Sequence, residues 1–366
     1  MDGRIIEVSA QSRSPKIVIS GYYGFDNCGD EAVLLSIIHC LGKLAPETRI
    51  TVLSGNPEKT REVYGVDAAN RWNPLIIAKE LISCRLLISG GGSLIQDVTS
   101  VRSPGYYLGV IRMAQFFRKR VMIYGQGIGP LTIEKNRDAT AKAFNRCSAI
   151  IIRDPASAEL LKDIGVKRDV QVTCDPVLAL DEAELVEVTP NREIPDCLVS
   201  SPCLLVAVRN WKDDRHIPPI AELLDGQAAK GWNILLVPAH FPSDMDAIAK
   251  LRAKMKIQPQ SIDKCLSARE FLSLAASADR VFSMRLHGLI CAMAMGTPML
   301  GVSYDPKIDA FMEQAGAEKY CLHFDDFDIA KAQQLLDETP PSMETRRLEL
   351  KEQAWETARV AIGLLQ

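Results

Sequence analysis

Short runs of β-branched and aliphatic residues alternate with longer amphipathic stretches along most of the chain. In the first half, apolar runs occupy residues 16–20, 49–55, 85–91, 120–126, 149–154 and 170–175, and helical patterns occupy 30–44, 104–119, 133–147 and 155–165. Continuous apolar runs of this length are typical of strands buried on both faces of a parallel sheet. The alternation therefore predicts a doubly wound α/β sheet.

The alternation breaks at residues 181–202, which are acidic, contain proline and show no apolar period. Apolar runs resume at 203–210, 233–240, 280–284 and 298–305, with helical patterns near 217–230, 243–256, 268–278, 288–296 and 306–315. We expect an N-terminal Rossmann-like domain at 1–180, a linker at 181–202 and a C-terminal Rossmann-like domain at 203–366. A last helix at 342–365 is of the kind that packs across both. The parallel sheets would then face a central cleft, where open α/β sheets bind ligands.

Composition narrows the classes of function. The 366 residues are 47% hydrophobic, enough for two cores, and the formal charge of −3 gives no global field that would hold nucleic acid. The ten cysteines form no C-x-x-C pair, which favours reduced thiols in the cytoplasm. No metal-binding motif, signal peptide or apolar run of about 18 residues is present. We therefore expect a cytoplasmic protein that binds neither a metal nor nucleic acid.

The loop after the first strand reads GYYGFDNCGDEA over residues 21–32. Its glycines, Gly24 among them, let the backbone approach a ligand, and Asp30 could accept hydrogen bonds from sugar hydroxyls or act as a base. Equally, Asn27 or Asp30 could simply cap the following helix. The loop is not a G-x-G-x-x-G motif and no acidic residue ends the second strand, so the sequence disfavours a dinucleotide site.

Three other strand exits are candidates for ligand contacts. SGGGSLIQD (89–97) includes Gly91 and Gly92, whose backbone N–H groups are free to face an anion or a sugar. YGQGIGPL (124–131) adds Gln126 as a neutral hydrogen-bonding side chain, and His240 follows the strand at 233–240. At each of these positions a purely structural role stays open.

Cationic side chains follow three further strands. Arg153 either enters the cleft or pairs with a neighbouring acid such as Asp154. The sharpest pattern is VFSMRLHGLICAMAMG (281–296), which places Arg285 and His287 at a helix N-terminus, a position that favours anions. Lys307 follows the next strand. The sequence predicts an anion pocket here, although a capping imidazole and a solvated ammonium are the structural alternatives.

The helical pattern at 106–120 combines aromatic residues with Arg112, Arg118, Lys119 and Arg120. Such a helix could lie on an anionic bilayer. The sheet needs a covering helix at this point, which favours a core helix with basic residues at its end.

Taken together, the loops resemble the bacterial polysaccharide pyruvyl transferase family over most of the chain. The motifs that carry the resemblance are GYYGFDNCGDEAVL (21–34), ISGGGSLIQD (88–97), YGQGIGP (124–130), IIRDPAS (151–157), CDPVL (174–178), SMRLHGLICAMAMGTP (283–298) and SYDPK (303–307). The resemblance implies a GT-B-like pair of Rossmann-like domains and transfer of a pyruvyl group from phosphoenolpyruvate to two hydroxyls of one sugar. The chain is most similar to the branch that modifies N-acetylmannosamine in lipid-linked secondary cell-wall polymer precursors, which later anchor S-layer proteins.

The resemblance also assigns the donor side of the cleft, whereas the acceptor contacts are expected from the strand-exit loops described above. Donor-binding roles fall on Arg153, Arg285, Leu286, His287 and Lys307. The expected acceptor contacts are Gly24, Asn27, Asp30, Gly91, Gly92, Gln126 and His240. Because ketal formation needs proton transfer, His287 and Asp30 are the expected catalytic residues.

The expected partners are phosphoenolpyruvate and a lipid-linked saccharide, with no cofactor. Peripheral contact with the inner face of the cell membrane and a homo-oligomer stay open. The alternatives are a GT-B glycosyltransferase that uses a nucleotide sugar and a non-catalytic protein that binds sugar phosphates.

Overall fold

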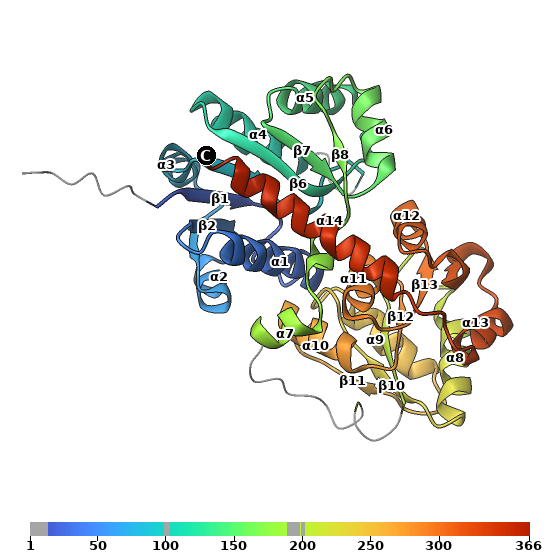
Figure 1. Cartoon of the computed structure of the whole chain (residues 1–366). Helices are drawn as coiled ribbons and strands as arrows, with labels where there is room; N and C mark the ends of the chain where they lie inside the picture. Colours follow the sequence, from blue (N-terminus) through green and yellow to red (C-terminus); the bar gives the residue numbers. More distant parts are fainter. Residues whose placement is uncertain (1–13, 99–102, 189–197, 199–201) are drawn as a thin grey trace, which may run out of the picture.

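The computed structural model describes residues 14–98, 103–188, 198 and 202–366. Its backbone forms two β-sheets, one from strands before residue 173 and one from strands after residue 202 (Figure 1). All pairings between the named strands of the described ranges are parallel. The predicted α/β class with two parallel sheets is confirmed.

The first sheet has eight described strands in the order β3-β2-β1-β4-β6-β7-β8, with β5 paired to β6 beyond the end of β4. The strands are β1 (Lys16–Ser20), β2 (Arg49–Ser54), β3 (Asp67–Asn70), β4 (Leu86–Ser89), β5 (Gly92–Ile95), β6 (Arg120–Ile128), β7 (Ala149–Ile152) and β8 (Gln171–Val172). Its helices are α1 (Cys28–Leu44), α2 (Pro57–Tyr64), α3 (Pro74–Ser83), α4 (Ser103–Phe116), α5 (Glu134–Phe144) and α6 (Pro155–Asp163).

Alternate residues of the strands supply two hydrophobic cores. Ile17 and Ile19 of β1 pack into the core that contains α1, whereas Val18 packs into the core beneath α3, α4 and α5. All three side chains are fully buried. Burial on both faces explains why these strands appear in the sequence as continuous apolar runs.

The second sheet has six described strands in the order β11-β10-β9-β12-β13-β14. They are β9 (Cys203–Ala207), β10 (Asn233–Leu236), β11 (Gln260–Ser261), β12 (Arg280–Ser283), β13 (Met299–Ser303) and β14 (Cys321–His323). Its helices are α8 (Ile217–Ala229), α9 (Met245–Lys254), α10 (Ala268–Ser277), α11 (Leu286–Met295), α12 (Pro306–Gln314) and α13 (Ile329–Asp337). Among the described residues, no helix is both long and apolar enough to cross a membrane.

The structure adds elements that the apolar pattern does not indicate. The short strands β3, β11 and β14 and the helices α2 and α3 are absent from the sequence-based expectation. The glycine-rich stretch at 89–97 is not only a loop, because β5 forms within it and continues the edge of β6. The stretch at 181–202 is not without structure either, since α7 (Glu182–Val188) lies in it. The three missed strands are short, and none of them contains more than two consecutive apolar residues, so no apolar run marks them.

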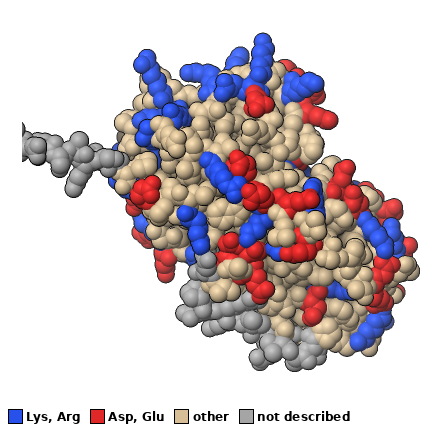
Figure 2. Space-filling view, in the orientation of Figure 1, with Lys and Arg blue, Asp and Glu red and all other residues tan. Residues whose placement is uncertain are grey.

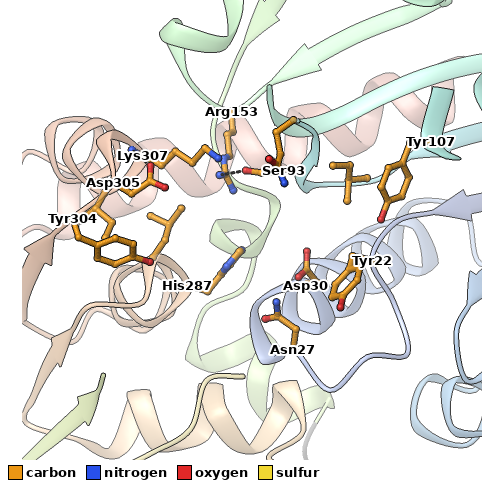
Figure 3. Close-up of a pocket in the computed structure, with 14 residues that line it drawn as sticks. Tyr22, Asn27, Asp30, Ser93, Tyr107, Arg153, His287, Tyr304, Asp305 and Lys307 are labelled. Atoms are coloured by element: carbon orange, nitrogen blue, oxygen red, sulfur yellow. Dashed lines mark hydrogen bonds between the residues drawn. The ribbon is translucent and has the colours of Figure 1, made fainter. Parts of the chain in front are cut away.

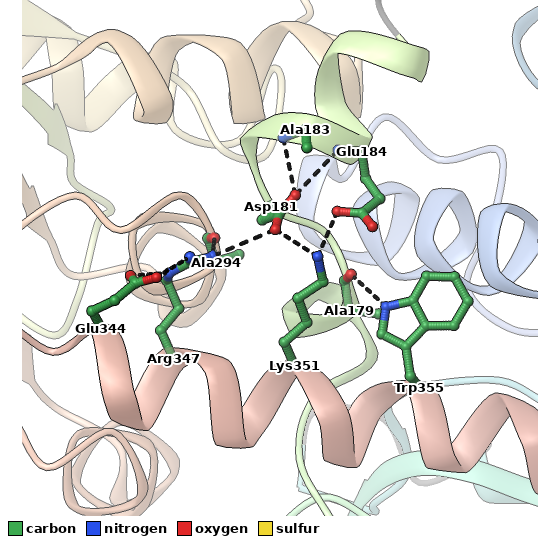
Figure 4. Close-up of polar contacts among 9 residues, drawn as sticks. All are labelled: Ala179, Asp181, Ala183, Glu184, Ala294, Glu344, Arg347, Lys351 and Trp355. Carbon is green, nitrogen blue, oxygen red and sulfur yellow. Dashed lines mark hydrogen bonds and ion pairs between the residues drawn. The ribbon is translucent and has the colours of Figure 1, made fainter.

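The C-terminal helix α14 (Glu344–Gly363) runs along both halves of the molecule (Figure 1). At one end Arg120 Nη1 donates to the Leu364 carbonyl at 2.5 Å, and at the other Arg347 Nη1 donates to the Ala294 carbonyl at 3.3 Å. In the middle, Lys351 Nζ lies 2.5 Å from Asp181 Oδ2 and 2.7 Å from Glu184 Oε2 (Figure 4). The helix therefore ties the chain segment between the two sheets to both of them.

We expect Lys351→Met to lower the free energy of unfolding by about 1–3 kcal/mol, because it removes the nearest cation from two close, largely buried carboxylates and leaves Asp181 with only the more distant Arg347, at 3.9 Å. The side chains of Lys351, Asp181 and Glu184 are only 17–19% exposed. Urea unfolding measures the difference. Arg359→Met is the matched control, because Arg359 makes two ion pairs on the same helix but is 43% exposed. Equal effects of the two substitutions would contradict the role of Lys351.

Candidate active site

A cavity of about 280 Å³ opens between the two sheets, beyond the ends of β1, β7, β12 and β13 (Figure 3). Its volume is close to the lower end of the roughly 300–1,000 Å³ that is usual for small-molecule sites. Its lining is contributed by both halves of the chain: Tyr22, Asn27, Asp30, Ser93, Leu94, Gln96, Tyr107, Arg153, Leu286, His287, Tyr304, Asp305, Lys307 and Ile308.

Arg153 stands at the end of β7, one residue before Asp154 caps α6. Its guanidinium is buried and donates to Asp175 Oδ2 at 2.9 Å and to Ser93 Oγ at 3.0 Å. Gly127 makes room for it, because a Cβ at that position would lie 2.8 Å from Arg153 Nε. The two alternatives that the sequence left open for Arg153 therefore both apply: it lines the cavity and is also paired with acids.

His287 lies in the first turn of α11, directly after β12. Its ring packs against Gly29 of α1 and points into the space between Arg153 and Asp30 (Figure 3). Its Nε2 is 3.7 Å from Asp175 Oδ2 and has no hydrogen-bond partner in the described part of the chain.

The surroundings of His287 lower its pKa to about 4. Burial is the largest cause, the Arg153 and Arg285 cations act in the same direction, and Asp175 opposes them. The imidazole is therefore neutral at neutral pH and can accept a proton.

Asp30 faces His287 from the first turn of α1 (Figure 3). A Cβ on Gly92 would lie 2.6 Å from its Oδ1, so the glycine of β5 allows the carboxylate into the cavity. Burial, followed by the Glu31 carboxylate, raises the pKa of Asp30 to about 7. A carboxyl with this pKa can exchange a proton near neutral pH.

Lys307 lies in the first turn of α12, which Asp305 caps by accepting from the Lys307 backbone N–H at 3.0 Å. Its ammonium forms no ion pair with any described acidic side chain. Burial lowers the pKa of Lys307, and the nearby Arg153 cation adds to the effect, whereas Asp305 opposes it. Lys307 is thus a partly desolvated cation that is available to an anionic ligand.

Comparison with known families decides where the chain belongs. A family model described as polysaccharide pyruvyl transferase matches residues 27–306, a span that contains every cavity residue except Tyr22, Lys307 and Ile308. The chain belongs to the polysaccharide pyruvyl transferase family. A search of curated proteins returned no match.

Solved structures that resemble this pyruvyl transferase family member share its fold at low sequence identity. The UDP-GlcNAc 2-epimerase from Neisseria meningitidis, bound to UDP-GlcNAc, has a TM-score of 0.61 and 13% identity over 96% of this chain and 99% of its own. The Methanocaldococcus jannaschii UDP-GlcNAc 2-epimerase gives 0.57 and 10% over 95% and 99%. A glycosyltransferase from Rickettsia africae gives 0.53 and 13% over 96% of each chain. These neighbours confirm the predicted GT-B-like fold.

Arg285, which the family resemblance places at the donor site, does not line the cavity. Its guanidinium makes a two-point ion pair with Asp244, whose side chain is fully buried. Asp244 Oδ2 also accepts from the backbone N–H groups of Ala239 and His240. Arg285 therefore joins the loop after β10 to the start of α11. This ion pair helps to position His287, which follows two residues later.

The remaining expected acceptor residues divide into cavity and support positions. Asn27 lines the cavity and caps α1 by accepting from the Gly29 N–H. Gly92 lies directly behind Asp30. Five of the expected acceptor residues lie outside the lining: Gly24, Gly91, Gly92, Gln126 and His240. Gln126 is fully buried and donates to Ser89 Oγ at 2.7 Å, so its side chain is held inside the sheet.

Sequence reasoning missed Asp175, which is 2% exposed and contacts both Arg153 and His287 through the same oxygen. Its signal was the CDPVL motif at the end of a strand. It also missed several residues of the cavity wall: Tyr22, Ser93, Leu94, Gln96, Tyr107, Tyr304, Asp305 and Ile308. Within the described ranges, no three His, Cys, Asp or Glu side chains are grouped so that they could hold a metal ion.

Proposed function

We propose that this protein transfers a pyruvyl group from phosphoenolpyruvate to two hydroxyls of one sugar in a lipid-linked saccharide. The products are a cyclic ketal and phosphate. One observation carries the proposal: His287 lies between the cations Arg153 and Lys307 on one side and Asp30 on the other (Figure 3). N-acetylmannosamine in a cell-wall polymer precursor is the acceptor that we place first, because of the sequence resemblance.

The cationic side of the cavity suits a small donor with two acidic groups. Phosphoenolpyruvate carries a phosphate and a carboxylate a few atoms apart, so it needs more than one cation. Lys307 offers a free ammonium, and Arg153 adds a guanidinium that Asp175 holds in place. The N-terminus of α11 and that of α12 also face this side and favour negative charge.

The reaction needs one proton delivered to carbon and two removed from hydroxyls. Protonation of C3 makes C2 oxocarbenium-like, the first sugar hydroxyl forms a C–O bond to C2 and loses its proton, and phosphate leaves with the electrons of the C2–O bond. The second hydroxyl then attacks C2 and loses its proton. His287 is assigned the proton on the donor side, and Asp30 accepts from the sugar hydroxyls.

Donor binding is expected to set the protonation state that this division of roles needs. In the empty cavity the neighbouring cations contribute to the low pKa of His287. A bound dianion would neutralise Arg153 and Lys307, so we expect it to raise the pKa of His287 toward neutrality. The imidazole would then carry a proton only when the donor is present. That proton would be available to C3 of the donor.

The proposal is tested by offering the purified protein a panel of lipid-linked disaccharides with either phosphoenolpyruvate or a nucleotide sugar. We expect release of one phosphate for each pyruvyl group that mass spectrometry finds on the saccharide, with the nucleotide sugar left intact. His287→Gln is the control for background hydrolysis. Transfer of a hexose would instead identify a glycosyltransferase, and tight binding of both ligands without turnover would identify a non-catalytic protein.

A further inference from the structure

A basic groove lies between α4 and α5, at the far end of α4 from the cavity. It has a volume of about 560 Å³ and is lined by Arg112, Gln115, Phe116, Lys142, Ala143 and Arg146. Tyr107 of the same helix lines the catalytic cavity. Nine residues separate Tyr107 from Phe116, which places the groove about 14 Å along the helix axis. We call this surface the α4–α5 groove.

Large apolar side chains are exposed around the C-terminal end of α4, which borders the α4–α5 groove. Phe116 ends α4 with 79% of its surface exposed, and Ile82 near the end of α3 is 55% exposed. The two helix ends are neighbours, because Lys119 Nζ donates to the Ile82 carbonyl at 2.7 Å. The opposite face of α4 is different, since Val110, Ile111 and Ala114 are buried. Thus α4 covers the sheet with one face, as favoured from the sequence, and its other face, which includes Arg112 and Phe116, is exposed.

The charged side chains that line the groove are all cationic. Arg112, Lys142 and Arg146 are all exposed, and none of them forms an ion pair within the described residues. No acidic residue lines the groove. Along α14, by contrast, Arg347, Lys351 and Arg359 all pair with acids.

The space-filling view shows Lys and Arg side chains gathered over this end of the first half, around α4 and α5 (Figure 2). In a chain with a formal charge of −3, such a patch is local. Exposed aromatic and aliphatic side chains ringed by unpaired cations are typical of surfaces that lie on anionic lipid.

We propose that the α4–α5 groove docks the protein on an anionic lipid bilayer. Phe116 and Ile82 enter the headgroup region, while Arg112, Lys142 and Arg146 face the lipid phosphates. This inference rests on the proposed function, in which the acceptor is a lipid-linked saccharide. A saccharide anchored in the bilayer would reach the cavity over the length of α4.

Co-sedimentation of the full chain with vesicles tests the docking. We expect binding to phosphatidylcholine vesicles that contain 30% phosphatidylglycerol (about one lipid in three), weak binding to pure phosphatidylcholine, and release at high salt. The triple variant R112Q/K142Q/R146Q should bind about 100-fold more weakly. Phe116→Ser should bind about 10-fold more weakly and keep the salt dependence. The matched control is K254Q/K256Q/K331Q, which removes the same charge from exposed positions of the second half that form no ion pair within the described residues.

Equal binding of the two triple variants, or equal binding to charged and neutral vesicles, would overturn the docking surface. Displacement by inorganic phosphate at matched ionic strength would show a site for free anions instead of a bilayer. The result is separable from the proposed function. Pyruvyl transfer to a soluble, lipid-free saccharide should be unchanged in R112Q/K142Q/R146Q, whereas transfer to a vesicle-embedded acceptor should fall. Vesicle binding without any pyruvyl transfer would reject the function and retain the surface.

Discussion

His287→Gln is expected to lower kcat for phosphate release by about 10²–10⁴-fold, the range typical of a lost general acid or base. Glutamine keeps a polar side chain of similar length beside Gly29 but cannot carry the proton. The loss should appear in kcat with little change in the KM for phosphoenolpyruvate, because Lys307 and Arg153 still hold the donor. Steady-state phosphate release at pH 7.5 measures both parameters.

Lys307→Met separates binding from proton transfer in the same cavity. It removes the cation that has no ion pair and preserves the length of the side chain. We expect the KM for phosphoenolpyruvate to rise by about 10–100-fold, since a charge-assisted contact is worth about 1.5–3 kcal/mol. If His287→Gln behaved like Lys307→Met, with higher KM and normal kcat, His287 would be a binding residue only.

The fold was predictable from the sequence wherever strands are buried on both faces. The runs that contain β1 and β6 are recognisable because each has at least three consecutive apolar residues, at 17–19 and at 121–124. The missed strands lie at sheet edges and are short, and β3 consists of Asp67–Asn70, which carries no apolar run. Their pairing depends on neighbours that are distant in the sequence, so no local period marks them.

The sequence predicts which residues lie near the candidate site, but not which of their side chains form ion pairs with residues distant in the sequence. Arg153, His287 and Lys307 meet because parallel strands end at one edge of each sheet, a rule that needs no coordinates. Arg285 satisfies the same rule but is paired with Asp244, 41 residues away, and no spacing in the sequence marks that ion pair.

The protonation states of His287 and Asp30 could not be predicted from the sequence either. An unperturbed histidine titrates near neutrality and an unperturbed aspartate well below it. Burial in the cavity reverses the order, because it disfavours the charged form of each: the pKa of His287 falls to about 4 and that of Asp30 rises to about 7. The order therefore depends chiefly on burial, which the fold creates, and the Glu31 carboxylate adds to the rise in the pKa of Asp30.

Asp30→Asn is expected to abolish most activity and yet to stabilise the protein at alkaline pH. In the native state the raised pKa of Asp30 favours the protonated carboxyl, so the native state holds this proton where the unfolded chain releases it. The contribution of Asp30 to stability is therefore lost as pH rises from about 4 to about 7. Asparagine mimics the protonated form. We expect a gain on the order of 1–3 kcal/mol at pH 8 that vanishes near pH 4, measured by urea unfolding.

The pH profile of the wild-type enzyme gives the matching kinetic test. If ionised Asp30 accepts the hydroxyl proton, kcat/KM should rise with pH through about 7. Glu31→Gln is the matched control, because Glu31 lies outside the cavity lining and its charge helps to raise the pKa of Asp30. Glutamine Oε1 can still accept from the Gly24 N–H, and its amide N–H group can donate to the Tyr64 hydroxyl oxygen in place of the bond that the carboxylate accepts. We expect it to shift the rising limb to lower pH while activity persists; an unshifted limb would mean that another group accepts the proton.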